Sequence, residues 1–166
     1  MRSAIDIAVP CRAWSAVGGV KALCRRAATA ALRAPEADGS APQVEPVEIS
    51  IMLADDATLH DLNRRFRGID KPTNVLSFPA GGERLPDAPL MLGDIAIAFE
   101  TCAAEAARDG KPLTDHLAHL VVHGVLHLRG YDHERDQDAA MMEPLETAIL
   151  GRLGVADPYA TEALVP

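Results

Sequence analysis

The amino-acid sequence predicts an α+β fold, in which a small mixed, mostly parallel sheet is covered by helices. Short segments in which apolar and polar residues alternate, as in half-buried strands, are separated by longer segments with helical periodicity. The chain also lacks the glycine-rich phosphate-binding loop of a Rossmann or P-loop domain. With 166 residues it is long enough for one well-buried core, so we expect a single domain over residues 1–166.

Four segments show the period-two alternation and the bordering turn residues that are typical of strands. They are residues 4–9, which Pro10 closes, and residues 47–53, 74–78 and 91–98. Loops rich in glycine and proline are expected over residues 35–46 and 80–89.

Helices are predicted where apolar residues recur every three or four positions. The predicted ranges are residues 14–33, 55–66, 99–108, 114–128 and 136–153. We expect Asp55 or Asp56 to cap the second helix, Gly68 to end it, and Thr114 to cap the fourth. The last helix, which should pack over the fourth, is expected to begin at Asp136 or Asp138.

Three histidines in the segment His123-Gly-Val-Leu-His127-Leu-Arg-Gly130-Tyr-Asp-His133 have the spacing of metal ligands. Residues four apart lie one turn above each other on a helix, so His123 and His127 project from one face. Gly130 suits the left-handed backbone that ends a helix, after which the chain can turn back and bring in His133. We therefore predict a site with these three ligands and an open fourth position. Zinc is the default ion, although imidazole also binds nickel, copper and iron.

The histidine spacing equals that of the metzincin signature H-E-x-x-H-x-x-G-x-x-H, so the site helix is zincin-like, but Gly124 replaces the glutamate that serves as general base. Peptide hydrolysis by the zincin route is therefore disfavoured. His116 and His119 lie upstream on the same helix face, within an arc of roughly 80° at about 100° per residue. We expect these two histidines to pack or to orient ligands.

Positive charge is concentrated at the end of the second predicted helix, at Arg64, Arg65, Arg67 and Lys71. Arg64 and Arg65 could simply complement the helix dipole. Arg67 lies beside Gly68, from where its guanidinium can reach into a cleft and hold a phosphate with two parallel hydrogen bonds. We therefore predict Arg67 as a catalytic residue.

The composition limits the class of protein. A net charge of −8 argues against binding nucleic acid through a general positive field, but leaves room for a local basic patch. Cys11, Cys24 and Cys102 are far apart, which predicts neither a disulfide framework nor a thiolate metal site and fits a reducing cytoplasm. The early Asp6, and the lack of any run of eighteen apolar residues, lead us to expect neither export nor membrane insertion.

Two separated stretches resemble the YbeY family of bacterial endoribonucleases. They are L-N-x-x-F-R-G-x-D-K-P-T-N-V-L-S-F-P over residues 62–79 and H-G-x-L-H-L-x-G-Y-D-H over residues 123–133, and L-G-D-I over residues 92–95 also fits. The resemblance implies a metal-dependent endoribonuclease that cuts single-stranded RNA in maturation of the 3′ end of small-subunit ribosomal RNA and in ribosome quality control. Ribosomal RNA and the ribosome or small-subunit assembly proteins would be its partners.

The resemblance also implies residue roles. The metal ligands would be His123, His127 and His133, and the functionally important arginine of the family falls on Arg67. Phe66 stands where the family often has tyrosine, which removes a hydroxyl and keeps the ring.

The expected mechanism is that the metal activates a water and polarises a phosphate oxygen, while Arg67 stabilises the charge that builds up on the phosphate. Asp94 and Asp132 are candidate proton acceptors, although we favour structural roles: Asp94 bonding strand-end amides, and Asp132 bonding the turn or a ligand. Alternatively, the 2′-hydroxyl of the RNA attacks. Two competing hypotheses are a ribosome-assembly factor with a structural metal and a metzincin-like metalloprotease.

Overall fold

The computed structural model describes residues 3–36, 39–40, 46–81, 87–131 and 136–160, without the side chains of residues 136–139. In this part of the chain, four strands form one sheet in the order β1-β2-β4-β3. β1 (Ala4–Ala8), β2 (Val47–Ala54) and β4 (Leu90–Ala98) are parallel neighbours, and β3 (Val75–Pro79) runs antiparallel to β4 at the edge. The predicted mixed, mostly parallel sheet is confirmed.

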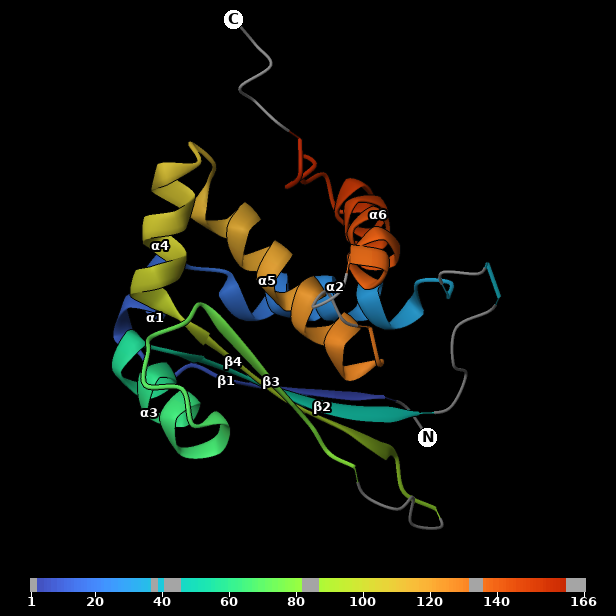
Figure 1. Ribbon diagram of the computed structural model, residues 1–166, viewed down its shortest axis with the longest axis horizontal. Coiled ribbons are helices and arrows are strands. Elements are labelled where there is room, and N and C mark those ends of the chain that lie inside the picture. The colour runs from blue at the N-terminus through green and yellow to red at the C-terminus, as the bar shows by residue number, and fades with distance from the viewer. Residues whose placement is uncertain (1–2, 37–38, 41–45, 82–86, 132–135, 161–166) are drawn as a thin grey trace, which may run out of the picture.

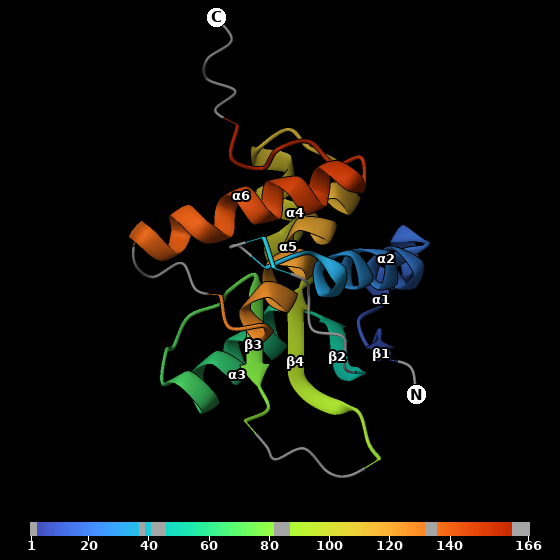
Figure 2. The ribbon, with the colours of Figure 1, turned by 90° about the vertical axis from the view of Figure 1, so that its right-hand side faces the viewer.

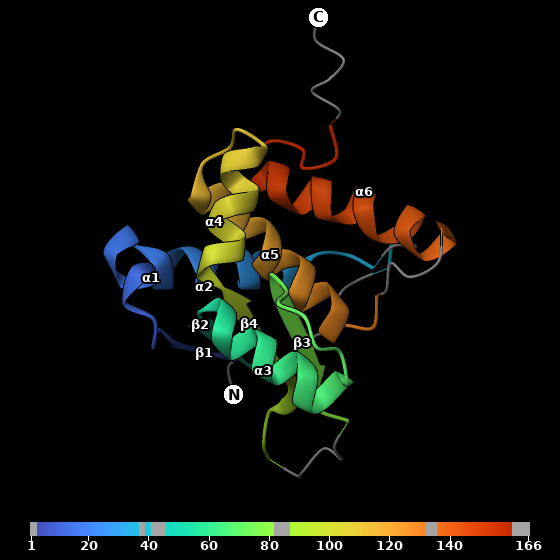
Figure 3. The same ribbon diagram turned by 60° about the vertical axis from the view of Figure 1, so that its left-hand side comes forward.

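Helices cover the two faces of the sheet unequally (Figure 1). α2 (Val20–Arg33) and α5 (Leu113–Leu128) lie against one face, with α4 (Phe99–Arg108) beside α5. α6 (Asp136–Arg152) crosses over α5 as an outer layer, as Figure 2 shows. On the opposite face, α3 (Asp56–Arg67) packs beneath β3 and β4 (Figure 3). The result is an α+β fold in which α5 is enclosed between the sheet and α6.

The prediction of one helix over residues 14–33 was wrong. The segment forms α1 (Arg12–Val17) and α2, separated by Gly18 and Gly19, whose φ angles are 81° and 68°. This left-handed backbone breaks the helical hydrogen-bond ladder. The fully buried Trp14 anchors α1 by donating from its indole to the carbonyl oxygen of Ala54 at 2.9 Å.

The ends of the other helices follow the prediction with one exception. The side chain of Asp55 accepts a hydrogen bond from the backbone N–H of Thr58, and Gly68 ends α3 in the left-handed conformation. Thr114, however, is not the N-cap of α5, because the helix already begins at Leu113 after Pro112. Proline fixes the φ angle and has no N–H to satisfy, so it can precede the first turn without a capping side chain.

The core lies between the sheet and the layer formed by α2 and α5. Apart from Trp14 of α1, its largest members come mainly from the inward face of β2 and β4 and from the buried side of α5: Ile49, Ile51, Leu53, Ile95, Ile97, Leu117 and Leu126. Met142 and Leu150 of α6 extend this core to the outer helix. Within the described residues, no helix combines the length and the apolar character that crossing a membrane requires.

Candidate metal centre

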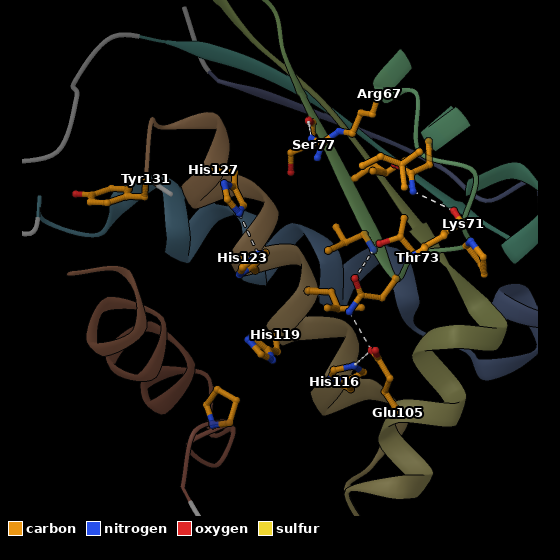
Figure 4. A pocket seen from close by; sticks show the side chains of 18 of the residues that line it. Arg67, Lys71, Thr73, Ser77, Glu105, His116, His119, His123, His127 and Tyr131 are labelled. Atoms are coloured by element: carbon orange, nitrogen blue, oxygen red, sulfur yellow. Dashed lines mark hydrogen bonds and ion pairs between the residues drawn. The ribbon is translucent and has the colours of Figure 1, made fainter. Parts of the chain in front are cut away.

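α5 presents four histidines along one side, and this histidine stripe consists of His116, His119, His123 and His127 (Figure 4). All four line a cavity of about 910 Å³ between α5, β3 and the segment that follows α6. The spacing of three and four residues places them on the same helix face, as predicted. Neighbouring rings meet edge to face, with centroids 4.6 Å apart for His123 and His127 and 6.2 Å apart for His119 and His123.

His123 and His127 face each other through the nitrogens that a metal needs. Their Nε2 atoms are 3.0 Å apart. Two imidazole nitrogens bound tetrahedrally to one zinc ion at 2.0–2.1 Å would lie about 3.3 Å apart. The pair therefore fits a shared ion with little adjustment. The third predicted ligand, His133, lies outside the described residues, as does Asp132.

The carboxylate of Glu146, on the inner side of α6, is bonded to this stripe. Its Oε1 lies 3.1 Å from Nδ1 of His123, and its Oε2 lies 2.7 Å from Nε2 of His119. The hydroxyl of Tyr159 donates to the same Oε2 at 2.9 Å. Burial would raise the pKa of Glu146, but the hydrogen bonds from His119 and His123 outweigh it and lower the pKa to about 2. The group is thus an ionised, fully buried carboxylate surrounded by donors.

The sequence interpretation missed Glu146. A usable signal exists in α6, because Glu146 lies four residues from Met142 and from Leu150, both fully buried. A carboxylate in phase with the buried apolar residues of a helix is unusual, since charged side chains are almost never fully buried without a partner. The prediction that α6 packs over the site is correct, and Met142 belongs to the core, whereas Met141 is exposed.

Two sets of ligands compete for a metal at this place. His119, His123 and Glu146 each offer a ligand atom, and these atoms lie within 4.8 Å of one another. The sequence predicts instead His123, His127 and His133. The two sets share His123 but use it differently, because its Nδ1 faces Glu146 while its Nε2 faces His127. The side of the imidazole ring that holds the ion therefore distinguishes them.

Gly124 faces the sheet, away from the cavity. A Cβ built on it would lie 3.1 Å from two side-chain carbons of Ile95 on β4, and its carbonyl accepts a hydrogen bond from the hydroxyl of Ser77 at 3.3 Å. The glycine thus lets α5 approach the sheet closely. A glutamate at this position would project into the core, so the missing metzincin base has a packing reason.

Arg67 lines the same cavity as the histidine stripe, from the end of α3. One Nη donates to the backbone oxygen of Ser77 at 3.0 Å, and the guanidinium lies 6.0 Å from the centre of the Phe78 ring. Arg64 and Arg65 instead pair with Asp61 on the exposed side of α3. Of the predicted cationic cluster, Arg67 and Lys71 therefore face the cavity.

Asp94, a candidate proton acceptor, does not line the cavity of the histidine stripe. Asp94 accepts a hydrogen bond from the hydroxyl of Ser50 rather than from strand-end amides, and it borders an apolar hollow with Phe66 and Phe78. Because Ile95 points to α5, its neighbour on the strand points to the opposite face of the sheet. Asp94 is thus too remote to accept a proton in the cavity.

His116, at the other end of the stripe, is held by Glu105 of α4. Its Nε2 lies 2.8 Å from Oε1 of Glu105, which also accepts a hydrogen bond from the side-chain amide of Asn74 at 3.0 Å. Burial lowers the pKa of His116, so its imidazole is neutral at pH 7. The second ring nitrogen, Nδ1, has no hydrogen-bond partner in the described part of the chain.

Comparison with known proteins gives a consistent result. A family model described as endoribonuclease YbeY matches residues 19–154. A protein named endoribonuclease YbeY from Paramagnetospirillum magneticum is 53% identical over 169 residues, covering 98% of this chain and 100% of the relative. Another protein of that name, from Rhodospirillum rubrum, is 55% identical over 154 residues, covering 89% of this chain and 76% of the relative.

A solved structure has the same fold. The solution structure of TM1509 from Thermotoga maritima matches with a TM-score of 0.50 and covers 95% of this chain and 99% of its own. Because the two sequences are 22% identical, this likeness concerns the fold alone.

Proposed function

The chain belongs to the endoribonuclease YbeY family, and on this premise we propose that it is a metal-dependent endoribonuclease that cuts single-stranded RNA. The observation that carries the proposal is that Arg67 and the facing pair His123 and His127 line one cavity. A metal ligand pair and a guanidinium that line one cavity can together hold one phosphodiester.

In this proposal, His123, His127 and His133 hold one zinc ion, with nickel or another divalent metal as the alternative. Such an ion supplies Lewis-acid chemistry when it is bound. Arg67 has N–H groups beyond the one bonded to Ser77, and these bind a phosphate oxygen and stabilise its growing negative charge. The bond to Ser77 holds the guanidinium against the edge strand, so that little rotamer freedom is lost when RNA binds.

The cellular role follows from the family resemblance. We propose maturation of the 3′ end of small-subunit ribosomal RNA and ribosome quality control in the cytoplasm, with the ribosome or small-subunit assembly proteins as partners. The net charge of −8 supports delivery of the substrate by such partners, because a long-range positive field is missing. Lys71 and Lys111 provide local positive charge along the cavity, whereas Arg108 is paired with Asp109.

A metalloprotease is disfavoured because Gly124 occupies the position of the usual glutamate base, and a side chain there would point toward Ile95 and away from the cavity. In an assembly factor with a structural metal, neither the metal nor Arg67 would have a catalytic role, and the protein would cut no RNA.

Cleavage of a single-stranded RNA by the zinc-loaded protein tests the proposal. His127→Ala should abolish cutting, and Arg67→Ala should lower its rate roughly 10²- to 10³-fold, the usual effect of removing one donor to a developing charge. Arg64→Ala is the matched control, since Arg64 lies on the same helix but pairs with Asp61 outside the cavity. The end groups of the products show whether water or the 2′-hydroxyl attacks.

Equal cutting by all four proteins would reveal a contaminating nuclease and overturn the proposal. A zinc-loaded wild type that cuts no RNA would favour the assembly-factor hypothesis. Cutting that is lost in His127→Ala but retained in Arg67→Ala would instead remove only the catalytic role of Arg67.

A further inference from the structure

Glu146 makes a set of contacts that a buried carboxylate rarely has. It is 0% exposed, and its oxygens meet His119, His123 and Tyr159 at 2.7 to 3.1 Å. A carboxylate in a core is stable only when donors replace the water that it lost. Burial and the neighbouring carboxylate raise the pKa of Tyr159, so its hydroxyl stays protonated and donates.

The contacts determine which ring nitrogens carry a proton. An ionised carboxylate only accepts hydrogen bonds, so the nitrogens that face it must be donors. Nδ1 of His123 is therefore the donor to Oε1, and Nε2 is the ring nitrogen that points away from the carboxylate. That Nε2 is the atom 3.0 Å from Nε2 of His127. By the same argument Nε2 of His119 is the donor to Oε2, whereas its Nδ1 has no partner among the described residues.

We propose that Glu146 is a positioning residue for the metal centre: it fixes the tautomer and the ring angle of His123 so that Nε2, beside His127, is the metal-binding nitrogen. The inference rests on the metal site of the proposed function and goes further by assigning the outer partner of a ligand. A histidine ligand usually donates its other N–H to a carboxylate or a carbonyl, which raises its basicity and orients its ring. His119 and Tyr159 occupy Oε2 and thereby hold Oε1 toward His123.

This assignment differs from a role of Glu146 as a direct ligand. An ion bound by His119, His123 and Glu146 would need the lone pairs of Nε2 of His119 and Nδ1 of His123, both of which now face the carboxylate. Both rings would have to change tautomer, and His127 would lose its place in the site. The positioning role needs neither change.

The first test is zinc affinity, measured by competition with a chromogenic chelator in the absence of RNA. Glu146→Gln should weaken zinc binding roughly 10- to 100-fold, the usual effect of losing the outer carboxylate of a histidine ligand. The matched control is Glu105→Gln, which alters a similar carboxylate bonded to His116 on the same helix face, and it should bind zinc as the wild type does. An unchanged affinity in Glu146→Gln would overturn the inference.

The second test reads the tautomer directly and does not depend on metal. Nitrogen-15 spectra of the histidine rings in the metal-free protein should show His123 protonated on Nδ1 in the wild type. Glu146→Leu should give a mixture of tautomers at His123, while the dispersion of the amide spectrum verifies that the variant is folded. A wild-type His123 protonated on Nε2, or an unchanged tautomer in the folded variant, contradicts the proposal.

A third variant separates the two ligand sets. His127→Ala should lose zinc if Nε2 of His123 binds the ion, whereas retention of one zinc per chain would make Glu146 a direct ligand and overturn the positioning role. These measurements use no RNA. A protein that shows all the expected effects but fails to cut RNA would therefore refute the proposed function and leave the inference intact.

Discussion

Two carboxylates are bonded to the histidine stripe of α5, Glu105 at its His116 end and Glu146 at its two middle members, and they are held differently. Glu146 contacts two histidines and a tyrosine with its side chain 1% exposed, whereas Glu105 contacts His116 and Asn74 with its side chain 24% exposed. Of the two histidines bonded to Glu146, His123 has its second nitrogen facing another imidazole, whereas the second nitrogen of His119 has no partner in the described residues. The second nitrogen of His116, which is bonded to Glu105, also has no partner there.

The difference shows that a bonded carboxylate and histidine do not by themselves indicate a metal centre. What matters is the nitrogen that the carboxylate leaves available and what that nitrogen meets. Glu105 ties α5 to α4 and to the start of β3, so its contacts are those of a structural link. Glu146 ties α5 to α6 and also orients a ring toward a possible ligand partner.

The largest effect expected from this comparison is on metal content. His127→Ala should reduce bound zinc from one ion per chain to a background level, because only two of the three proposed ligands, His123 and His133, would remain. His116→Ala, at the other end of the stripe, should keep the full amount. Elemental analysis after dialysis measures both, and metal loss in His116→Ala alone would reverse the roles of the two ends.

Gly124→Glu should cause the next largest effect, although it recreates the metzincin pattern in the sequence. The new carboxylate would enter the core against Ile95, costing about 3 kcal/mol or more of unfolding free energy through overpacking and charge burial. Gly151→Glu is the control, since a Cβ at this exposed helical glycine meets nothing within 4 Å. Urea unfolding compares the two, and equal stabilities would show that α5 has room to move away from the sheet.

Glu105→Ala should lower the unfolding free energy by about 1 kcal/mol, since it leaves His116 and Asn74 without their shared acceptor. Zinc affinity should stay the same, which isolates the structural role of this end. Thermal unfolding and chelator competition on the same sample check both statements. A tenfold loss of zinc affinity would show that the two carboxylates are not functionally distinct.

The smallest effect is expected for Tyr159→Phe, which removes one of the two donors to Oε2 of Glu146 and keeps the ring against His119. The unfolding free energy should fall by about 0.5–1 kcal/mol. Because Oε1 keeps its bond to His123, zinc should bind within a few fold of the wild type. A loss as large as that of Glu146→Gln would assign Tyr159 a direct part in orienting the ligand.

Local sequence signals predicted most of the elements and the pairing of His123 with His127, because a four-residue spacing on a helix needs no tertiary information. The break between α1 and α2 could have been read from Gly18-Gly19, but the alanine-rich periodicity on both sides concealed it. Thr114 was expected to cap α5, yet the preceding proline begins the helix without a capping side chain.

The partners of Glu146 could not be predicted from the local sequence. Its partners His119 and His123 lie 27 and 23 residues earlier on another helix, so only the packing of α6 on α5 brings them together. The closeness of Gly124 to Ile95 likewise depends on how α5 meets β4. The assignment of His133 and Arg67 to the metal and to phosphate remains a prediction from spacing and resemblance.

The edge position of β3 bears on which polymers the cavity can accept. An extended peptide commonly binds by pairing its backbone with a free strand edge. Here the carbonyl of Ser77 already accepts a hydrogen bond from Arg67, and Pro79 has no N–H to donate. The strand is therefore a poor template for β-augmentation. The hydrogen bond from Arg67 of α3 to Ser77 discourages both peptide docking and edge-to-edge aggregation.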